Sequence, residues 1–291
     1  MDDSHSIASL FPNLFKTTKP ITVGSNALII SASLLHLDEA QVLPIVLGLD
    51  EKIDPSTKIK MFATLGGYSV LRVILEADPK DYLKLLWRPC QEFPNWIGSV
   101  KQTDALDVLL KVFDLTRLGD AAVEGMGTIP ALVTLQDILP LYKNDTIKSA
   151  LSVSEIGSER VEISPDAPLT DALRMMFERR VRRVFLSSDR KDSFSFISSR
   201  SIIRFLFSPE RLEIVKEDPE SWLNARLSDI DPSEAKIIAD GKIVNQAASE
   251  IGDRVDDCLA CEHANKVVTR WDIIMKPWKT GNYLFAGIPE D

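Results

Sequence analysis

The pattern of apolar and polar positions recurs four times along the chain. Each copy has an apolar strand, a short polar turn, and then an Asp or Ser at the start of an apolar helix. The four anchor residues are Ser69, Asp137, Ser201 and Asp272, which are 68, 64 and 71 residues apart. Spacing this regular predicts a repeated structural unit rather than one large domain.

The segments upstream of each anchor follow one order. Short β-rich runs open the copies at 21–23, 96–100, 160–163 and 236–238. An amphipathic helix follows, and in the third copy residues 169–179 carry apolar side chains at helical spacing. Second strands are predicted at 42–46, 121–123, 184–186 and 258–261, and a third strand leads into each anchor. The sequence therefore predicts an α/β (α+β) protein of four β-α-β-β-α repeats.

Each repeat is too small to bury its own sheet, so we expect the repeats to pack in pairs. A polar segment at 143–148 lies near the middle of the chain, and an acidic segment at 210–222 separates the third copy from the fourth. We predict a first pair over 1–145, with repeats at about 15–75 and 90–142. The second pair covers 146–291, with repeats at about 150–208 and 222–278.

The segments at 133–139 and 268–274 resemble the closing motif of cystathionine β-synthase-type (CBS) repeats, and 42–46 resembles their second strand. Residues 180–186 are similar to the helix-to-strand junction of such repeats, so the resemblance covers about 20–277. It implies two CBS pairs (Bateman modules), as in the γ subunit of AMP-activated protein kinase and in stand-alone prokaryotic and archaeal CBS proteins. Such modules bind AMP, ADP, ATP or S-adenosylmethionine between paired repeats and signal to a partner protein.

The closing motif offers groups that suit a ribose. An Asp at a helix start caps the helix and can also accept hydrogen bonds from two vicinal hydroxyls, while the helix N-terminus favours an anion. Complete versions pair Thr134 with Asp137 and Thr269 with Asp272. In the third repeat Ser198 and Ser201 stand at these positions, and serine cannot make the charged contact. The alternative is that all of these residues are simple helix caps.

Arg182 and Arg183 occupy positions where relatives in the resembled family place basic residues that bind phosphate. The corresponding places in the other repeats hold Gln41 and Val42, Gly119 and Asp120, and Asp256 and Asp257. The resemblance therefore predicts a basic phosphate site in the second pair only. The alternative is a solvated, ion-paired helix end.

The resemblance also implies an apolar slot for adenine in the other repeat of each pair. Ile163, Pro168 and Leu186 are expected to serve the site of Asp272, and Thr22 and Val46 the site of Asp137. By default, strands of this composition are core.

The net charge is −9, from 34 basic and 43 acidic residues among 291. General nucleic-acid binding is therefore not expected. The acidic start at 1–3 is unlike a signal peptide, and the apolar run at 27–35 is too short for a membrane span. The three cysteines, Cys90, Cys258 and Cys261, favour a reducing compartment, so we predict a cytoplasmic protein.

Catalytic and metal chemistry find no support in the sequence. Cys258, Cys261 and His263 invite a zinc interpretation, but residues three apart on a strand point to opposite faces and no second ligand pair exists. The predicted function is a non-catalytic regulatory module that binds an adenine nucleotide and acts on an unidentified effector protein, with a homodimer as a further expectation. The alternative is a ligand-free CBS scaffold that mediates assembly. The third hypothesis is an enzyme or DNA-linked regulator with an unrecognised site.

Overall fold

A computed structural model describes residues 135–188, 194–254 and 256–286 of the chain. Before residue 135 it describes the helix and strand segments named below together with residues 78 and 84. In this earlier part, side chains are described only within 70–84.

The same arrangement of three strands occurs in four places. In each set the first strand pairs in parallel with the second, and the second strand pairs antiparallel with the third. The first two sets are β1 (Val23–Gly24), β2 (Leu43–Val46) and β3 (Met61–Leu65), and β5 (Ser99–Lys101), β6 (Ala121–Glu124) and β7 (Ala131–Val133). The other two are β10 (Glu162–Ile163), β11 (Arg183–Leu186) and β12 (Phe194–Ser198), and β13 (Ser233–Ile238), β14 (Leu259–Cys261) and β15 (Lys266–Val268). The repeated α+β arrangement predicted from the sequence is confirmed.

The third and fourth repeats share one sheet of order β10-β11-β12-β13-β14-β15-β9, in which β9 is Ser158–Glu159. Antiparallel pairing of β12 with β13 joins the two repeats. In the first half, β3 pairs in the same way with β4 (Asn95–Trp96). A short β8 (Ile147–Lys148) pairs with β16 (Leu284–Phe285) near the C-terminus.

Each anchor residue is the third residue of the helix that closes its repeat. These helices are α3 (Gly67–Glu76), α6 (Leu135–Lys143), α9 (Ser199–Leu206) and α12 (Arg270–Thr280). The anchors of α9 and α12 are not the residues that cap these helices. The cap is Ser198 for α9 and Thr269 for α12, each three residues before its anchor. The expectation that Asp272 is itself the cap is thus corrected: Thr269 and Asp272 form a reciprocal capping box.

The remaining helices pack partly against strands of the sheet and partly against other helices. They are α7 (Val153–Ile156), α8 (Leu169–Glu178), α10 (Pro209–Glu217) and α11 (Val244–Glu250), with 3₁₀ turns η2 (Pro79–Asp81), η4 (Ser221–Asn224) and η5 (Leu227–Asp229). The segment 210–222, interpreted as a linker, is therefore largely helical. Helix α10 begins after the cap residue Ser208, and Pro209 lies in its first turn, where proline is tolerated. The turn η4 also buries Trp222.

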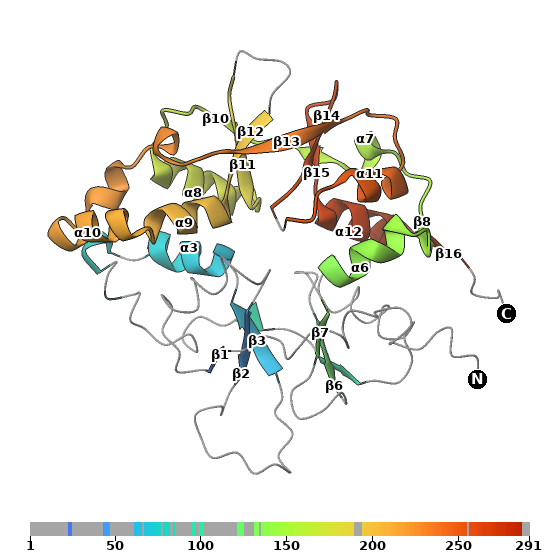
Figure 1. The fold of residues 1–291 in the computed structure, drawn as a ribbon, viewed down its shortest axis with the longest axis horizontal. Helices are drawn as coiled ribbons and strands as arrows, with labels where there is room; N and C mark the ends of the chain where they lie inside the picture. The colour runs from blue at the N-terminus through green and yellow to red at the C-terminus, as the bar shows by residue number, and fades with distance from the viewer. Residues whose placement is uncertain are drawn as a thin grey trace, which may run out of the picture.

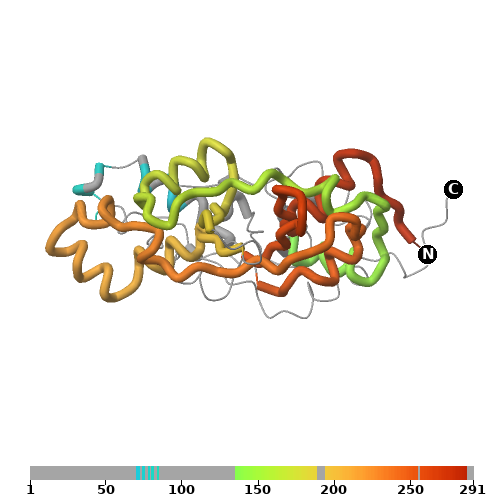
Figure 2. The backbone as a smooth tube through the Cα atoms, turned by 90° about the horizontal axis from the view of Figure 1, so that it is seen from above, coloured from blue at the N-terminus to red at the C-terminus, as the bar shows by residue number. Residues whose placement is uncertain are grey.

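Helices from the N-terminal half complete the cores of the C-terminal half. Val70, Leu71 and Ile74 of α3 join α8 and α9 in one core. Leu135, Ile138, Leu139, Leu141 and Tyr142 of α6 join α11 and α12 in another. Figure 1 shows α3 beneath α8 and α9, and α6 beside α12, and Figure 2 shows the same molecule from above. A third, smaller core around Phe185 and Phe196 lies between the two halves of the sheet.

The predicted division of the chain near residue 145 stays a prediction. What the structure adds is that α6, the last element assigned to the first pair, is buried against the fourth repeat. Within the described residues, no helix has the length and apolar character needed to cross a membrane.

Candidate functional site

The turn between α8 and β11 sets the position of Arg182 and Arg183. Arg180 adopts a left-handed conformation with φ 55° directly after α8. The Val181 N–H donates to the Met176 carbonyl at 2.9 Å, and the Arg180 N–H donates to that of Phe177 at 3.3 Å. This arrangement ends the helix as a left-handed glycine usually does. The chain then enters β11 with Arg182 exposed and Arg183 partly buried.

Arg183 links the third repeat to the fourth. Its Nη1 donates to the carbonyl oxygens of Asp256 at 2.9 Å and of Asp257 at 3.4 Å. The guanidinium lies 5.4 Å from the centre of the Phe196 ring. Burial acts to lower the pKa of Arg183, but Cys258, Asp256 and Asp272 outweigh burial and the pKa is raised. Part of the guanidinium therefore serves the contact between repeats, which the sequence did not predict.

The strand register corrects the predicted correspondence between the two junctions. Arg183 pairs with Ser198, the cap of α9, whereas Leu259 pairs with Val268, the residue before the cap Thr269. The residue opposite Thr269 is thus Cys258, so Cys258 corresponds to Arg183 and Asp257 to Arg182. Asp256, which the sequence predicts at the place of Arg182, therefore lies one residue before that place. Burial raises the pKa of the Cys258 thiol, and the neighbouring Arg183 opposes that effect.

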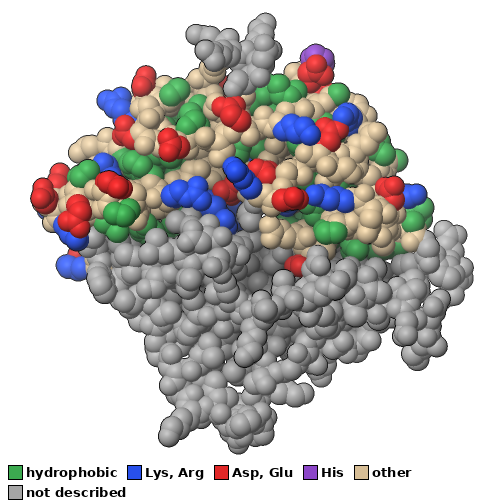
Figure 3. Space-filling model, in the orientation of Figure 1, with side chains coloured by type: hydrophobic (Ala, Val, Ile, Leu, Met, Phe, Trp, Pro, Cys, Tyr) green, Lys and Arg blue, Asp and Glu red, His purple; other side chains and the backbone are tan. Residues whose placement is uncertain are grey.

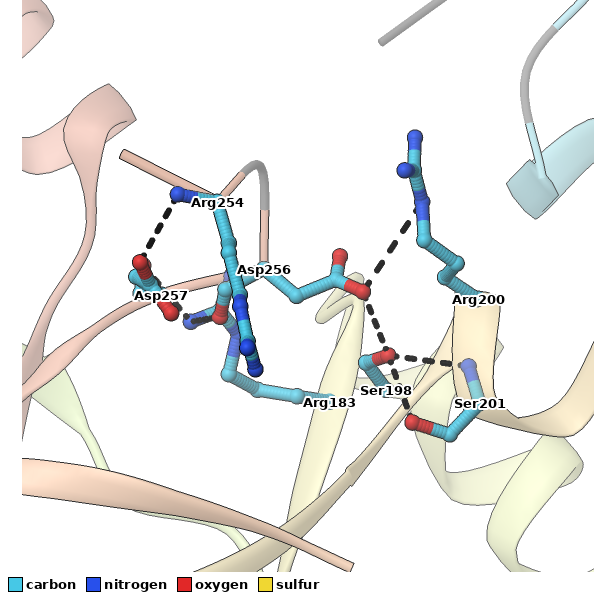
Figure 4. A network of polar contacts seen from close by, with 7 residues as sticks. All are labelled: Arg183, Ser198, Arg200, Ser201, Arg254, Asp256 and Asp257. Atoms are coloured by element: carbon cyan, nitrogen blue, oxygen red, sulfur yellow. Dashed lines mark hydrogen bonds and ion pairs between the residues drawn. The ribbon is translucent and has the colours of Figure 1, made fainter. Parts of the chain in front are cut away.

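An acidic side chain of the fourth repeat reaches the start of α9 (Figure 4). Ser198 Oγ donates to Asp256 Oδ2 at 2.9 Å and accepts from the Ser201 N–H at 3.0 Å. The Ser201 hydroxyl lies 3.1 Å from that of Ser198, and Arg200 Nε lies 3.9 Å from the same carboxylate oxygen. Asp256 therefore supplies from within the chain the negative charge that a phosphate would bring to this helix N-terminus.

Asp272 is 2% exposed, and both of its carboxylate oxygens accept hydrogen bonds. Oδ1 accepts from Ser158 Oγ at 2.8 Å. Oδ2 accepts from the Thr269 N–H at 2.9 Å and from Thr269 Oγ1 at 2.7 Å. An ionised carboxylate has about four acceptor positions, so a ribose hydroxyl could still share this group. The structure thus brings Thr269 and Asp272 together as predicted and adds Ser158 of β9.

Burial raises the pKa of the Asp272 carboxyl above its ordinary value of 3.8, while hydrogen bonds from Thr269 and Ser158 oppose the shift. A carboxyl group with a raised pKa stabilises the folded chain most below its unfolded-state pKa, and this contribution is lost as pH rises through the folded-state pKa. We expect the wild-type chain to lose stability relative to Asp272→Asn as pH rises from about 4 to about 7. Urea unfolding of both proteins across this range measures the difference. A wild-type advantage that grows with pH would contradict the argument.

The residues that the sequence predicts to bind a ligand in the first pair are only partly described by the structure. Asp137 is the third residue of α6 and is partly buried. Thr134 and Thr22 lie outside the described residues, and of Val46 only the backbone, at the end of β2, is described. The ribose role of Thr134 and Asp137 stays a prediction.

The residues expected around adenine in the second pair do not share one environment. Ile163 is buried in the core with α8 and α9, and Leu186 packs against that core. Pro168 is exposed at the start of α8. Ile163 and Leu186 are neighbours in the sheet, where β10 pairs with β11. Their contacts are those of core side chains, and the adenine role of all three stays a prediction.

Charged side chains gather where the third and fourth repeats meet. Figure 3 shows basic side chains close together near the middle of this face, with acidic side chains among them. The local mixture differs from the overall acidic balance of the chain. An anion can therefore meet positive charge here despite a net charge of −9.

The structure is similar to that of a protein from Methanocaldococcus jannaschii described as a proposed archaeal homologue of g-AMPK. The identity is 16%, the match covers 89% of this chain and 96% of the other, and the TM-score is 0.71. An uncharacterised conserved protein from Pyrococcus horikoshii matches with 13% identity, coverage of 89% and 95%, and a TM-score of 0.50. A CBS-pair protein from Arabidopsis thaliana matches 46% of this chain and 98% of its own, with 13% identity and a TM-score of 0.35.

The similarity to the Methanocaldococcus jannaschii protein over 89% of the chain shows that the chain has the CBS fold. The resemblance recognised in the closing motifs is thereby confirmed at the level of the fold. No protein-family model matches the chain, and no curated protein matches its sequence. The CBS assignment therefore rests on the arrangement of strands and helices, which the sequence motifs had indicated.

Cys258 and Cys261 lie within the buried part of this CBS fold. Both are buried free thiols, and burial raises the pKa of Cys261 to about 11. Among the described residues, no group of three or more His, Cys, Asp or Glu side chains is arranged to hold a metal ion.

Proposed function

We propose that the second CBS pair binds an adenine nucleotide between the third and fourth repeats. The observation that carries the proposal is the pair Arg182 and Arg183 at the start of β11. Arg183 contacts the fourth repeat, while Arg182 is exposed and makes no ion pair among the described residues. An exposed guanidinium beside this contact can form forked hydrogen bonds to phosphate oxygens.

The two helix starts at this proposed site, those of α9 and α12, differ in charge. At the start of α9 the carboxylate of Asp256 already meets Ser198 and Ser201. At the start of α12 the closing motif is complete, with Thr269 and Asp272. We therefore assign the ribose to the Asp272 end, with the phosphates directed toward Arg182.

The positive charge of the two arginines favours phosphate-bearing ligands. AMP, ADP and ATP bring negative charge to Arg182, whereas the sulfonium of S-adenosylmethionine brings positive charge. We assign no catalytic role. A ligand that binds one arrangement of the repeats better than another would shift the chain toward that arrangement, and an effector protein would detect the difference. Such an effector, and pairing of two copies of this chain, remain expectations.

Titration calorimetry with AMP, ATP, adenosine and S-adenosylmethionine tests the proposal. Arg182→Gln should weaken AMP binding about tenfold or more, because hydrogen bonds to charged groups contribute about 1.5–3 kcal/mol. Adenosine affinity should not change, because adenosine lacks phosphate. Arg204→Gln is the matched control, since Arg204 is an exposed arginine on α9. Equal losses for AMP and adenosine would overturn the phosphate role of Arg182.

A ligand-free scaffold is the second candidate function. The observation that favours it is the carboxylate of Asp272, which is 2% exposed and already accepts hydrogen bonds from Ser158 and Thr269. The same titration separates the two functions. No heat with any of the four compounds would favour the scaffold.

A further inference from the structure

A cavity of about 230 Å³ lies between α6 and α12. Its lining consists of Gln136, Leu139, Pro140 and Lys143 from α6, Asp253 from the loop after α11, and Arg270 at the start of α12. None of the residues assigned above to ribose, phosphate or adenine lines it. Pockets for drug-sized ligands measure about 300–1,000 Å³, so the size of this cavity suits a small ion or a single chemical group.

Arg270 is the unusual member of this lining. The side chain is 5% exposed, and its Nη2 donates to the Gly252 carbonyl at 2.6 Å. Its Nε and Nη1 are buried and have no hydrogen-bond partner among the described residues. Leaving donors of a buried charged group unpaired is costly. Burial lowers the pKa of Arg270, while Asp257, Asp253 and Asp256 act in the opposite direction. Two of the three guanidinium nitrogens of this buried side chain therefore have no acceptor within the part of the chain that the structure describes.

Lys143 provides a second positive charge at the rim of the cavity. Its Nζ lies 3.2 Å from Asp253 Oδ1, and the Asp253 side chain is 98% exposed. The Lys143 side chain is 31% exposed. An ion pair with so exposed a partner contributes little, so the lysine can turn to a stronger acceptor at small cost. Among the residues that line the cavity, the two cations Arg270 and Lys143 accompany one carboxylate, that of Asp253.

We propose that Arg270 and Lys143 bind a tetrahedral oxyanion of the phosphate type in the cavity between α6 and α12. Such an anion offers several oxygen atoms, which match the unpaired donors of a planar guanidinium. Because α6 closes the second repeat and α12 the fourth, the bound anion would join the N-terminal and C-terminal halves. The same chemistry could be supplied by free phosphate or by the phosphoryl group of a nucleotide.

Thermal denaturation and calorimetry of the full chain with inorganic phosphate, at ionic strength fixed with sodium chloride, test this site. Phosphate should raise the midpoint temperature more than chloride does, because it binds the folded state. Lys143→Gln should weaken phosphate binding about tenfold. Asp253→Asn should strengthen it about two- to fivefold, because the competing carboxylate is removed. Both residues lie at the surface, so these variants leave the core intact.

Matched controls are Lys148→Gln and Asp166→Asn, which change exposed charges outside the cavity lining. Neither control should alter phosphate binding. Arg270→Gln should abolish the phosphate response in whatever fraction of the protein folds. A response that is equal in Lys143→Gln, Asp253→Asn and the controls would overturn the site, as would the absence of any response to phosphate or AMP.

AMP serves as the second probe. A response to inorganic phosphate that depends on Lys143 supports a free ion as the source. A response to AMP alone that depends on Lys143 supports the phosphoryl group of a nucleotide. A phosphate response that is lost in Arg182→Gln but kept in Lys143→Gln would overturn the proposal, because the ion would then bind at the proposed nucleotide site between the third and fourth repeats. The oxyanion site and the proposed nucleotide site can therefore fail separately.

Discussion

Replacing Leu71 with alanine is expected to lower the free energy of unfolding by about 2–5 kcal/mol, the usual cost of truncating a fully buried leucine. Leu71 lies in α3, in the N-terminal half of the sequence, yet it is 0% exposed in the core that contains α8 and α9. The lost contacts and the cavity left behind both contribute. Urea unfolding followed by circular dichroism measures the change. Because α3 completes a core of the C-terminal half, we expect one transition rather than two.

Ile214→Ala is the control for this experiment. Ile214 lies on α10 and is 46% exposed, so its truncation should change stability by no more than about 0.5 kcal/mol. A Leu71→Ala variant as stable as Ile214→Ala would mean that α3 does not hold the two halves together in solution. A separate, early transition in the wild-type chain would lead to the same conclusion.

Asp272→Ala is expected both to weaken AMP binding about tenfold or more and to destabilise the fold by about 1–3 kcal/mol. The destabilisation follows from the buried donors that lose their acceptor: Ser158 Oγ on one side, and the Thr269 N–H and hydroxyl on the other. The affinity loss follows from the proposed ribose contact. Calorimetry with AMP and urea unfolding measure the two effects on the same preparation.

Asp229→Ala provides a matched control. Asp229 is exposed and accepts a hydrogen bond from the Arg226 N–H at 2.9 Å at the start of η5. Its removal should cost about 1 kcal/mol or less and leave AMP affinity unchanged. If Asp272→Ala loses stability but keeps the wild-type affinity for AMP, then Asp272 is a structural capping residue and the ribose assignment is wrong.

The candidate site shows which contacts a local sequence pattern can predict and which it cannot. The spacing of Thr269 and Asp272 predicted that they act together, because residues at the cap and third position of a helix are in contact whatever the rest of the fold does. Ser158 gave no such signal, since it lies 114 residues from Asp272 and meets it only because β9 pairs with β15. Likewise, the one-residue shift from Asp257 to Cys258 as the counterpart of Arg183 depends on strand register, and the hydrophobic pattern specifies register only weakly where strands are this short.

The sequence by itself determined the repeat: its period, its order of strands and helices, and the closing motif that resembles CBS repeats. These features follow from hydrophobic periodicity and helix capping, which act over a few residues. Only the tertiary structure decided that α3 and α6 complete the cores of the C-terminal half, that Asp256 lies against Ser198, and that Arg270 is buried beside a cavity. The reason is physical: amphipathic helices of similar composition can pack against any apolar face, so the choice of partner depends on shape and connectivity across the whole chain.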